Sequence, residues 1–146
     1  ALAKELARTK DEWGAVLLLD LHSMPPLRKQ IGEERTAQFV LGDRFGASCD
    51  ASLIGRALRH FEDYGQVAAH NRPYAGGFVL DHHCAPRRGI HGVQVEVCRS
   101  TYLDQRMEQP GSQMVSVAQS LAVMVRELGA ATAQLPHDGV FPQAAE

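Results

Sequence analysis

The sequence lacks the features of a membrane, nucleic-acid-binding or disulfide-stabilised protein. No purely apolar run is longer than that from Ala15 to Leu19, far short of the roughly 20 residues that cross a bilayer. Fifteen basic residues against seventeen acidic ones give a net charge of -2, so there is no excess positive charge to hold a phosphate backbone. The three cysteines form no C-x-x-C pair, and the opening residues show no basic stretch followed by an apolar one, the pattern that signals export. We therefore expect no membrane or nucleic-acid partner and a cytoplasmic location.

Several common catalytic motifs are also missing. The sequence contains no H-E-x-x-H or H-x-x-E pair, no G-x-S-x-G elbow, and no Walker A or G-x-G-x-x-G loop. The absence of these motifs argues against the metalloproteases, α/β-hydrolases and nucleotide-binding enzymes that carry them. Any active site must be sought in other combinations of residues.

What is present is the composition of one soluble globular domain of 146 residues with 45% hydrophobic side chains. Hydrophobic periodicity and turn residues predict helices over 2–13, 50–64 and 112–128. They predict strands over 15–19, 39–41, 66–69, 78–80 and 92–99, separated by loops over 21–38, 71–77 and 81–92. Residues 130–146 are expected to form a frayed tail. Strands that alternate with helices predict an α/β fold.

The opening helix has no Ser, Thr, Asp or Asn before it that could cap its amino end. This pattern predicts that the helix continues from residues further upstream. We therefore expect residues 1–146 to form part of a larger domain.

The strand over 92–99 alternates most clearly. Val93, Val95 and Val97 are expected on one face, with Gln94, Glu96 and Cys98 on the other. A carboxylate within an apolar strand is costly unless it is paired or functional. Glu96 is therefore a candidate general base, and an ion pair with Arg99 or another arginine is the equally weighted alternative.

His22 is a candidate metal ligand. It follows the apolar run 15–19 in the stretch Asp20-Leu21-His22-Ser23-Met24-Pro25-Pro26, and ligands of α/β proteins bind beyond the carboxyl ends of strands. Asp20, two residues earlier on the same face, is expected to orient the imidazole ring. Taken alone, such a D-x-H pattern more often contains an ordinary loop histidine.

Four segments together resemble the N-formylglutamate amidohydrolase family. They are LLLDLHSMPP at 17–26, LGDRFGASCD at 41–50, NRPYAGGF at 71–78 and VQVEVCRSTYLD at 93–104. The resemblance implies a carboxypeptidase- or phosphorylase-like α/β fold, with a mixed, largely parallel sheet and helices on both faces. It also implies a zinc-dependent enzyme that hydrolyses N-formyl-L-glutamate to formate and glutamate, a step of histidine degradation.

The resemblance also implies roles for individual residues. His22 would be a zinc ligand, and Glu96 would be the catalytic glutamate that takes a proton from the attacking water. The dicarboxylate substrate calls for cationic and polar donors. The residues expected to bind it are Arg44, Asn71, Arg72, Tyr74 and Arg99.

A catalytic zinc normally has three protein ligands, and the resemblance implies that the other two lie upstream of residue 1. We therefore expect the chain to be the C-terminal part of such an enzyme, incomplete at its N-terminus. Two alternatives stay open. The chain could be a non-catalytic remnant that binds acidic amino-acid derivatives, or it could belong to a related hydrolase of another N-acyl amino acid, such as aspartoacylase or succinylglutamate desuccinylase.

Overall fold

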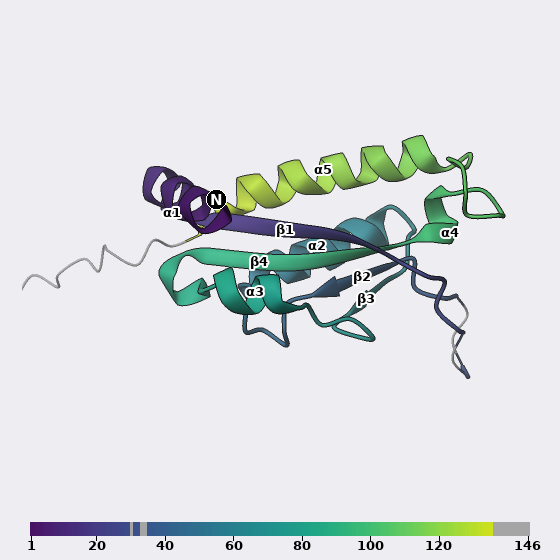
Figure 1. Ribbon diagram of the computed structural model, residues 1–146, viewed down its shortest axis with the longest axis horizontal. Helices are drawn as coiled ribbons and strands as arrows, with labels where there is room; N and C mark the ends of the chain where they lie inside the picture. The colour runs from purple at the N-terminus through teal and green to yellow at the C-terminus, as the bar shows by residue number, and fades with distance from the viewer. Residues whose placement is uncertain (30, 33–34, 136–146) are drawn as a thin grey trace, which may run out of the picture.

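A four-stranded sheet organises the part of the chain that the computed structural model describes, residues 1–29, 31–32 and 35–135 (Figure 1). The strand order is β1-β4-β2-β3. β1 pairs with β4 and β2 with β3 in parallel, whereas β2 and β4 are antiparallel. The strands are β1 (Val16–Met24), β2 (Phe39–Gly42), β3 (Ala68–His70) and β4 (Ile90–Cys98). The prediction of a mixed, largely parallel sheet is confirmed.

Helices pack on both faces of this sheet, also as predicted. α2 and α5 contact each other over one face, and α5 runs along β1 (Figure 1). α3 packs against β4 on the opposite face. The helices are α1 (Leu2–Trp13), α2 (Ala51–Asp63), α3 (Phe78–His83), α4 (Arg99–Tyr102), α5 (Met114–Thr132) and a 3-10 turn at Pro86–Arg88.

The main core lies between the sheet and the α2–α5 pair. Val93, Val95 and Val97 of β4 point into it, which confirms the alternation read from the sequence. Phe39 of β2 stacks on Phe61 of α2 with ring centroids 4.2 Å apart. Because this face of β4 is filled by valines, the polar residues between them must face the other side of the sheet.

The end of α1 and the start of α2 lie where the sequence predicts them. α1 stops at Trp13, and Gly14 follows with a φ of 83°, the left-handed conformation that glycine adopts without strain. Asp50 caps α2 by accepting a hydrogen bond from the Ser52 N–H at 2.8 Å. Both boundaries are set by local chemistry, which explains why they can be read directly from the sequence.

The structure corrects the prediction at β1, which does not end near residue 19. The strand continues through Met24, so His22 lies within it and not in a following loop. The reason is the partner strand: β4 extends to Cys98 and pairs with β1 over its whole length. Residues 25–29, 31–32 and 35–38 are without helix or strand; residues 30 and 33–34 of the expected loop lie outside the described residues.

The region 78–92 was predicted wrongly. Residues 78–80 are not extended but begin α3, and the expected loop holds the rest of α3, the 3-10 turn and the start of β4. A short apolar run does not distinguish a strand from a buried helix segment. Here Leu80 is buried against Gly92, whose missing side chain leaves room for α3 on β4. α4 was not predicted at all.

α5 buries Val117, Met124 and Leu128 in the core, at the spacing of one helix face. Met114 is exposed, and the helix continues to Thr132, three residues into the segment expected to fray. Residues 136–146 of that expected tail lie outside the described residues. By length and composition α5 alone among the described helices could cross a membrane. One such helix is weak evidence for a membrane span, because the core helix of a globular protein passes the same test.

A polar network ties α2 to α5. His60 of α2 lies 3.2 Å from the Ser120 hydroxyl and 3.0 Å from the Glu127 carboxylate, both on α5. Ser120 donates a hydrogen bond to the Gln66 side-chain oxygen at 3.0 Å. Ser120 is 1% exposed, so water cannot replace these partners. The network therefore fixes how α5 sits on α2.

Replacing Ser120 by alanine should destabilise the protein by about 1–3 kcal/mol, because it leaves buried polar partners unsatisfied. The free energy of unfolding in urea measures this loss. Ser116→Ala is the matched control, since Ser116 is exposed on the same helix and its change should stay within about 0.5 kcal/mol. Equal stability of the two variants would show that the network contributes nothing.

Candidate active site

The candidate site lies on the face of the sheet opposite the main core. In the parallel register of β1 and β4, Asp20 is paired with Gln94 and His22 with Glu96. Paired residues of neighbouring strands point to the same face. The structure therefore brings together the two leading sequence candidates, His22 and Glu96, and places Asp20 beside them.

Glu96 is held in a buried position by its neighbour on β4. Only 7% of Glu96 is exposed, and the Gln94 side-chain amide donates a hydrogen bond to its Oε1 at 2.8 Å. Gln94 in turn accepts a hydrogen bond from the Gly77 N–H at 3.1 Å. Glu96 makes no ion pair among the described residues, so the alternative pairing with Arg99 is not observed. Gln94 was not a candidate from the sequence, although its alternation with Glu96 could have indicated it.

His22 is half exposed and has Asp20 as its close neighbour. The Asp20 Oδ1 lies 3.1 Å from the His22 Nε2. A carboxylate on one ring nitrogen, with the other nitrogen available, is the arrangement in which proteins orient metal-binding histidines. The described residues nevertheless contain no group of three His, Cys, Asp or Glu side chains able to hold a metal ion. An imidazole is a donor that zinc accepts, but the described residues hold no complete set of ligands for a metal ion.

Asn71 and Asp43 fix the loop that follows β2. Asn71 is buried; its amide donates to the Asp43 Oδ1 at 2.7 Å, and its side-chain oxygen accepts from the Asp43 N–H at 2.9 Å. His70 also lies 3.0 Å from the same carboxylate. Both polar groups of Asn71 are thus engaged within the protein. Asp43 was not among the residues predicted from the sequence. Only its place in the segment LGDRFGASCD, at 41–50, indicated a role.

Arg44 lies beside the site because two loops approach closely. Its backbone N–H donates to the Ala75 carbonyl at 2.7 Å, and its guanidinium pairs with Asp81 of α3. This approach requires Gly42, since a Cβ at that position would lie 2.5 Å from the Ala75 carbonyl carbon. Gly42 therefore allows the 71–77 turn to reach the site.

The other predicted substrate-binding residues lie at the periphery. Arg72 stacks over the Phe45 ring at 6.0 Å and, with Arg28, lines a groove of about 670 Å³. Tyr74 packs on a small second core of Met24, Val40 and Cys98. Arg99 follows β4, and its buried Nε has no hydrogen-bond partner among the described residues. No hydrogen bond or ion pair within this part of the chain joins Arg72 or Arg99 to Glu96.

Cys84 also faces this region but is not equipped as a nucleophile. Burial raises the pKa of its thiol to about 11; nearby Arg44 opposes this shift and Asp20 adds to it. Burial likewise raises the pKa of Cys49 to about 12. The thiolate is the reactive form, so neither thiol is activated at neutral pH.

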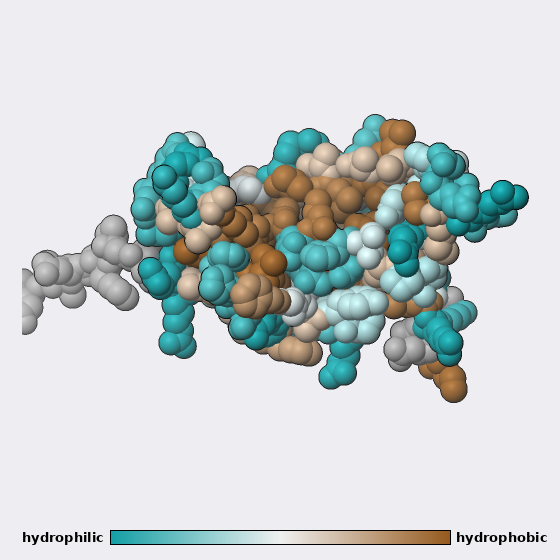
Figure 2. All heavy atoms as spheres, viewed as in Figure 1, coloured by the Kyte–Doolittle hydropathy of each residue, from teal (hydrophilic) through white to brown (hydrophobic). Residues whose placement is uncertain are grey.

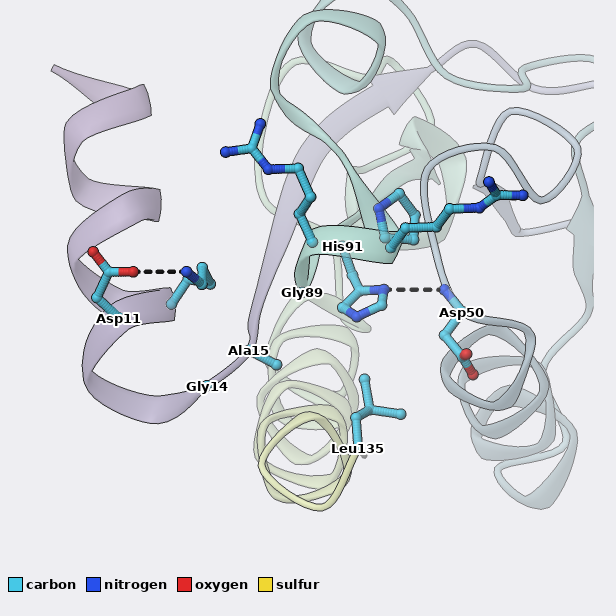
Figure 3. Close-up of a pocket in the computed structure, with 11 residues that line it drawn as sticks. Asp11, Gly14, Ala15, Asp50, Gly89, His91 and Leu135 are labelled. Carbon is cyan, nitrogen blue, oxygen red and sulfur yellow. Dashed lines mark hydrogen bonds and ion pairs between the residues drawn. The ribbon is translucent and has the colours of Figure 1, made fainter. Parts of the chain in front are cut away.

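A different pocket, of about 660 Å³, opens at the amino ends of β1 and β4 (Figure 3). In it the His91 Nδ1 accepts a hydrogen bond from the Asp50 N–H at 3.2 Å, and burial lowers the pKa of His91. Lys10 pairs with Asp11 at the rim. Since Glu96 and His22 lie toward the carboxyl ends of the same two strands, this pocket is separate from the candidate site.

Substituting alanine for Gly42 should destabilise the protein by about 1–3 kcal/mol, because the new methyl group would force the backbone at Ala75 to move. Gly129→Ala is the control: a Cβ there meets no atom within 4 Å, and alanine favours a helix by up to about 1 kcal/mol. Urea denaturation of both variants should show changes of opposite sign. If Gly42→Ala were as stable as the parent chain, the close approach would be unimportant.

Comparison with known proteins places these features in a family. The model of the N-formylglutamate amidohydrolase family matches residues 1–103. The N-formylglutamate deformylases of Pseudomonas aeruginosa and Pseudomonas putida are 34% and 31% identical to this chain over 130 residues, which is 87% of the chain and 47% of each relative. The chain thus spans about half the length of the curated relatives it matches.

Two solved structures agree with this result. The N-formylglutamate amidohydrolase of Ralstonia eutropha JMP134 superposes with a TM-score of 0.78 at 27% identity, over 88% of this chain and 48% of that structure. A gene product of Agrobacterium tumefaciens, at 18% identity and a TM-score of 0.58, shares the fold. The family match over most of the chain, together with these relatives, shows that the chain belongs to the N-formylglutamate amidohydrolase family.

Proposed function

We propose that this chain provides part of the active site of a zinc-dependent amidohydrolase that converts N-formyl-L-glutamate to formate and L-glutamate. The observation that carries the proposal is the pairing of His22 with Glu96 across β1 and β4, next to Asp20 and Gln94. The relatives are N-formylglutamate deformylases, which supports the choice of substrate. A role in histidine degradation is part of the same proposal.

In this proposal Glu96 moves the protons. Gln94 holds its Oε1, and Oε2 accepts no hydrogen bond from any described residue, so it is available to a water molecule. Glu96 would accept a proton as that water attacks the formyl carbon, and would pass it to the glutamate nitrogen as the C–N bond breaks. The second proton of the attacking water would pass from the formic acid to the amine, so the products are formate and the protonated amine of glutamate, and atoms and charge balance.

His22 would bind the zinc ion, with Asp20 orienting its ring. When bound, zinc would polarise the formyl carbonyl and lower the pKa of water toward about 7. A complete ligand set would need at least one side chain from outside the described residues, because these hold no cluster of three suitable side chains. The role of His22 is thus to fix one side of the metal beside Glu96.

The substrate carboxylates would be bound by arginines around the site. Arg99 is the strongest candidate, since its buried Nε lacks a partner among the described residues and buried donors are normally satisfied. Arg44 and Arg72, with Tyr74, remain proposed contacts, and Asn71 would act by holding the loop that carries Arg44.

The three cysteines are free, which supports a cytoplasmic location.

A full-length chimera tests this function. In it, the segment of the Pseudomonas aeruginosa deformylase that matches this chain is replaced by this chain, and formate release from N-formylglutamate is measured. Glu96→Gln should lower kcat by about 10²- to 10⁴-fold, the usual contribution of a general base. Glu62→Gln, which changes an exposed carboxylate on α2, should leave kcat unchanged. Undiminished turnover in Glu96→Gln would remove Glu96 from the mechanism.

The same chimera tests the metal site by its zinc content. His22→Ala should lose bound zinc, because a ligand is removed, whereas Glu96→Gln should retain it. His82→Ala is the control, since His82 is exposed on α3 and stacks on Phe78. Elemental analysis of the purified proteins gives the zinc-to-protein ratio. Full zinc in His22→Ala would exclude His22 as a ligand. A chimera that holds zinc and hydrolyses another N-acyl amino acid in preference would reassign the substrate.

A further inference from the structure

The pocket at the amino ends of β1 and β4 has one wall that the backbone holds in place (Figure 3). This wall is the 3-10 turn Pro86–Arg88. The turn is closed by two hydrogen bonds between Ala85 and Ile90, in which each N–H donates to the other residue's carbonyl at 2.8 and 3.2 Å. Gly89 follows with a φ of 76°, and a Cβ there would lie 2.8 Å from the Gly14 carbonyl oxygen. The turn is therefore fixed against the end of α1.

The turn carries two adjacent arginines, Arg87 and Arg88, and both line the pocket. Their side chains form no ion pair or hydrogen bond with any residue that the structure describes. Two neighbouring guanidinium groups repel each other unless an anion lies between them. Guanidinium groups also bind the oxygens of carboxylates and phosphates through paired, charge-assisted hydrogen bonds. A rigid turn with this composition therefore offers two donors to an anion in the pocket.

His91 supplies a third donor from within the pocket. It is only 5% exposed, and its Nδ1 accepts the hydrogen bond from the Asp50 N–H. Because burial lowers the pKa of His91, the ring is neutral at neutral pH and its proton lies on Nε2. Figure 3 shows this second nitrogen turned away from the hydrogen bond to Asp50, and no described residue accepts its proton. Buried donors normally have a partner, so this N–H is available to a ligand.

The acidic groups that line the pocket are already engaged. Asp11 pairs with Lys10 at 2.7 Å, and the Asp50 carboxylate accepts the Ser52 N–H as the cap of α2. Among the described charged residues of the lining, only the two arginines of the turn thus lack a counter-charge. The surface of α1, which borders the pocket, is mainly hydrophilic (Figure 2). These features favour a small, water-soluble anion.

We propose that this pocket is a second binding site that takes a phosphate dianion, either inorganic phosphate or the phosphate group of a small ester. A phosphate group carries about −1.5 to −2 charges at neutral pH and three strong acceptor oxygens. This matches the two guanidinium groups and the one imidazole N–H, whereas a carboxylate has one charge and two oxygens. The volume of about 660 Å³ also leaves room for the organic part of an ester, since small-molecule pockets measure about 300–1,000 Å³.

This site is independent of the proposed hydrolysis. The pocket lies at the amino ends of β1 and β4, whereas His22 and Glu96 lie toward the carboxyl ends of the same strands. Neither zinc nor N-formylglutamate takes part in phosphate binding. Failure of one proposal would therefore leave the other intact.

Isothermal titration calorimetry of the zinc-free chain with inorganic phosphate tests the site. A pH above the second phosphate pKa, about 6, keeps the probe a dianion. One phosphate per chain should bind saturably. Malonate, a compact dicarboxylate of the same charge, should bind about tenfold more weakly, because each of its ends leaves one charge-assisted hydrogen bond unmade. Glycerol phosphate is titrated in parallel: tighter binding than inorganic phosphate would identify an ester as the ligand, and equal or weaker binding would identify free phosphate.

Substitutions of the arginines locate the bound phosphate. Arg87→Gln and Arg88→Gln should each weaken phosphate binding about tenfold, because each removes a charge-assisted hydrogen bond. Arg126→Gln is the matched control, since it changes the net charge equally at an exposed position of α5 outside the pocket. Its effect should stay below about twofold, as expected for an exposed charge that touches no ligand. Circular dichroism confirms that each variant is folded.

The imidazole of His91 gives a readout that needs no loss of binding. Nitrogen NMR of the histidine side chains should show His91 as the neutral form with its proton on Nε2, and phosphate should shift that resonance. His91→Asn identifies the signal by its absence. This variant keeps a side-chain oxygen that can accept the Asp50 N–H but is too short to replace the Nε2 donor, so it should also weaken phosphate binding.

Three results would overturn the proposal. They are the absence of saturable phosphate binding at millimolar concentrations, equal weakening by Arg87→Gln and Arg126→Gln, and binding of malonate as tight as that of phosphate. If an arginine variant fails to fold, the His91 resonance of the unmodified protein still decides whether phosphate enters the pocket. If the chain by itself is unfolded, the same titrations are made on the zinc-free chimera described above.

Discussion

The parallel pairing of β1 with β4 is the contact on which the candidate site depends. His22 and Glu96 are 74 positions apart in the chain, and only this pairing makes them neighbours. A slip of one residue in such a pair would turn the affected side chains to the opposite face. Valines on the core face of β4, packed against α2 and α5, make that slip costly. The hydrophobic core therefore holds the polar site in register.

The rest of the site depends on how closely neighbouring backbone segments approach each other, rather than on the length of side chains. Gly42 lets the turn around Ala75 come close to β2, and Gly92 lets α3 come close to β4. The turn then presents the Gly77 N–H to Gln94, which holds Glu96. This chain of contacts gives a buried carboxylate one fixed oxygen and one available oxygen, which is the arrangement that proton transfer to and from water requires.

The same strand joins the candidate site to the edge of the sheet. β1 contributes Asp20 and His22 on one face and pairs with β4 alone among the described strands. The described residues hold no complete set of metal ligands, and the chain spans about half the length of the relatives it matches.

The sequence by itself determined the features that local chemistry controls. The Asp50 cap, the Gly14 end of α1 and the period-2 alternation at Val93, Val95 and Val97 follow from short-range geometry, and four segments indicated the family. Only the tertiary structure decided the features that need a distant partner. β1 reached Met24 because β4 lies alongside it, and residues 78–83 became a helix because Gly92 makes room for Leu80. Gln94 and Asp43 acquired their importance from loops far away in the sequence. Such contacts depend on how segments pack, and no periodicity within a single segment records them.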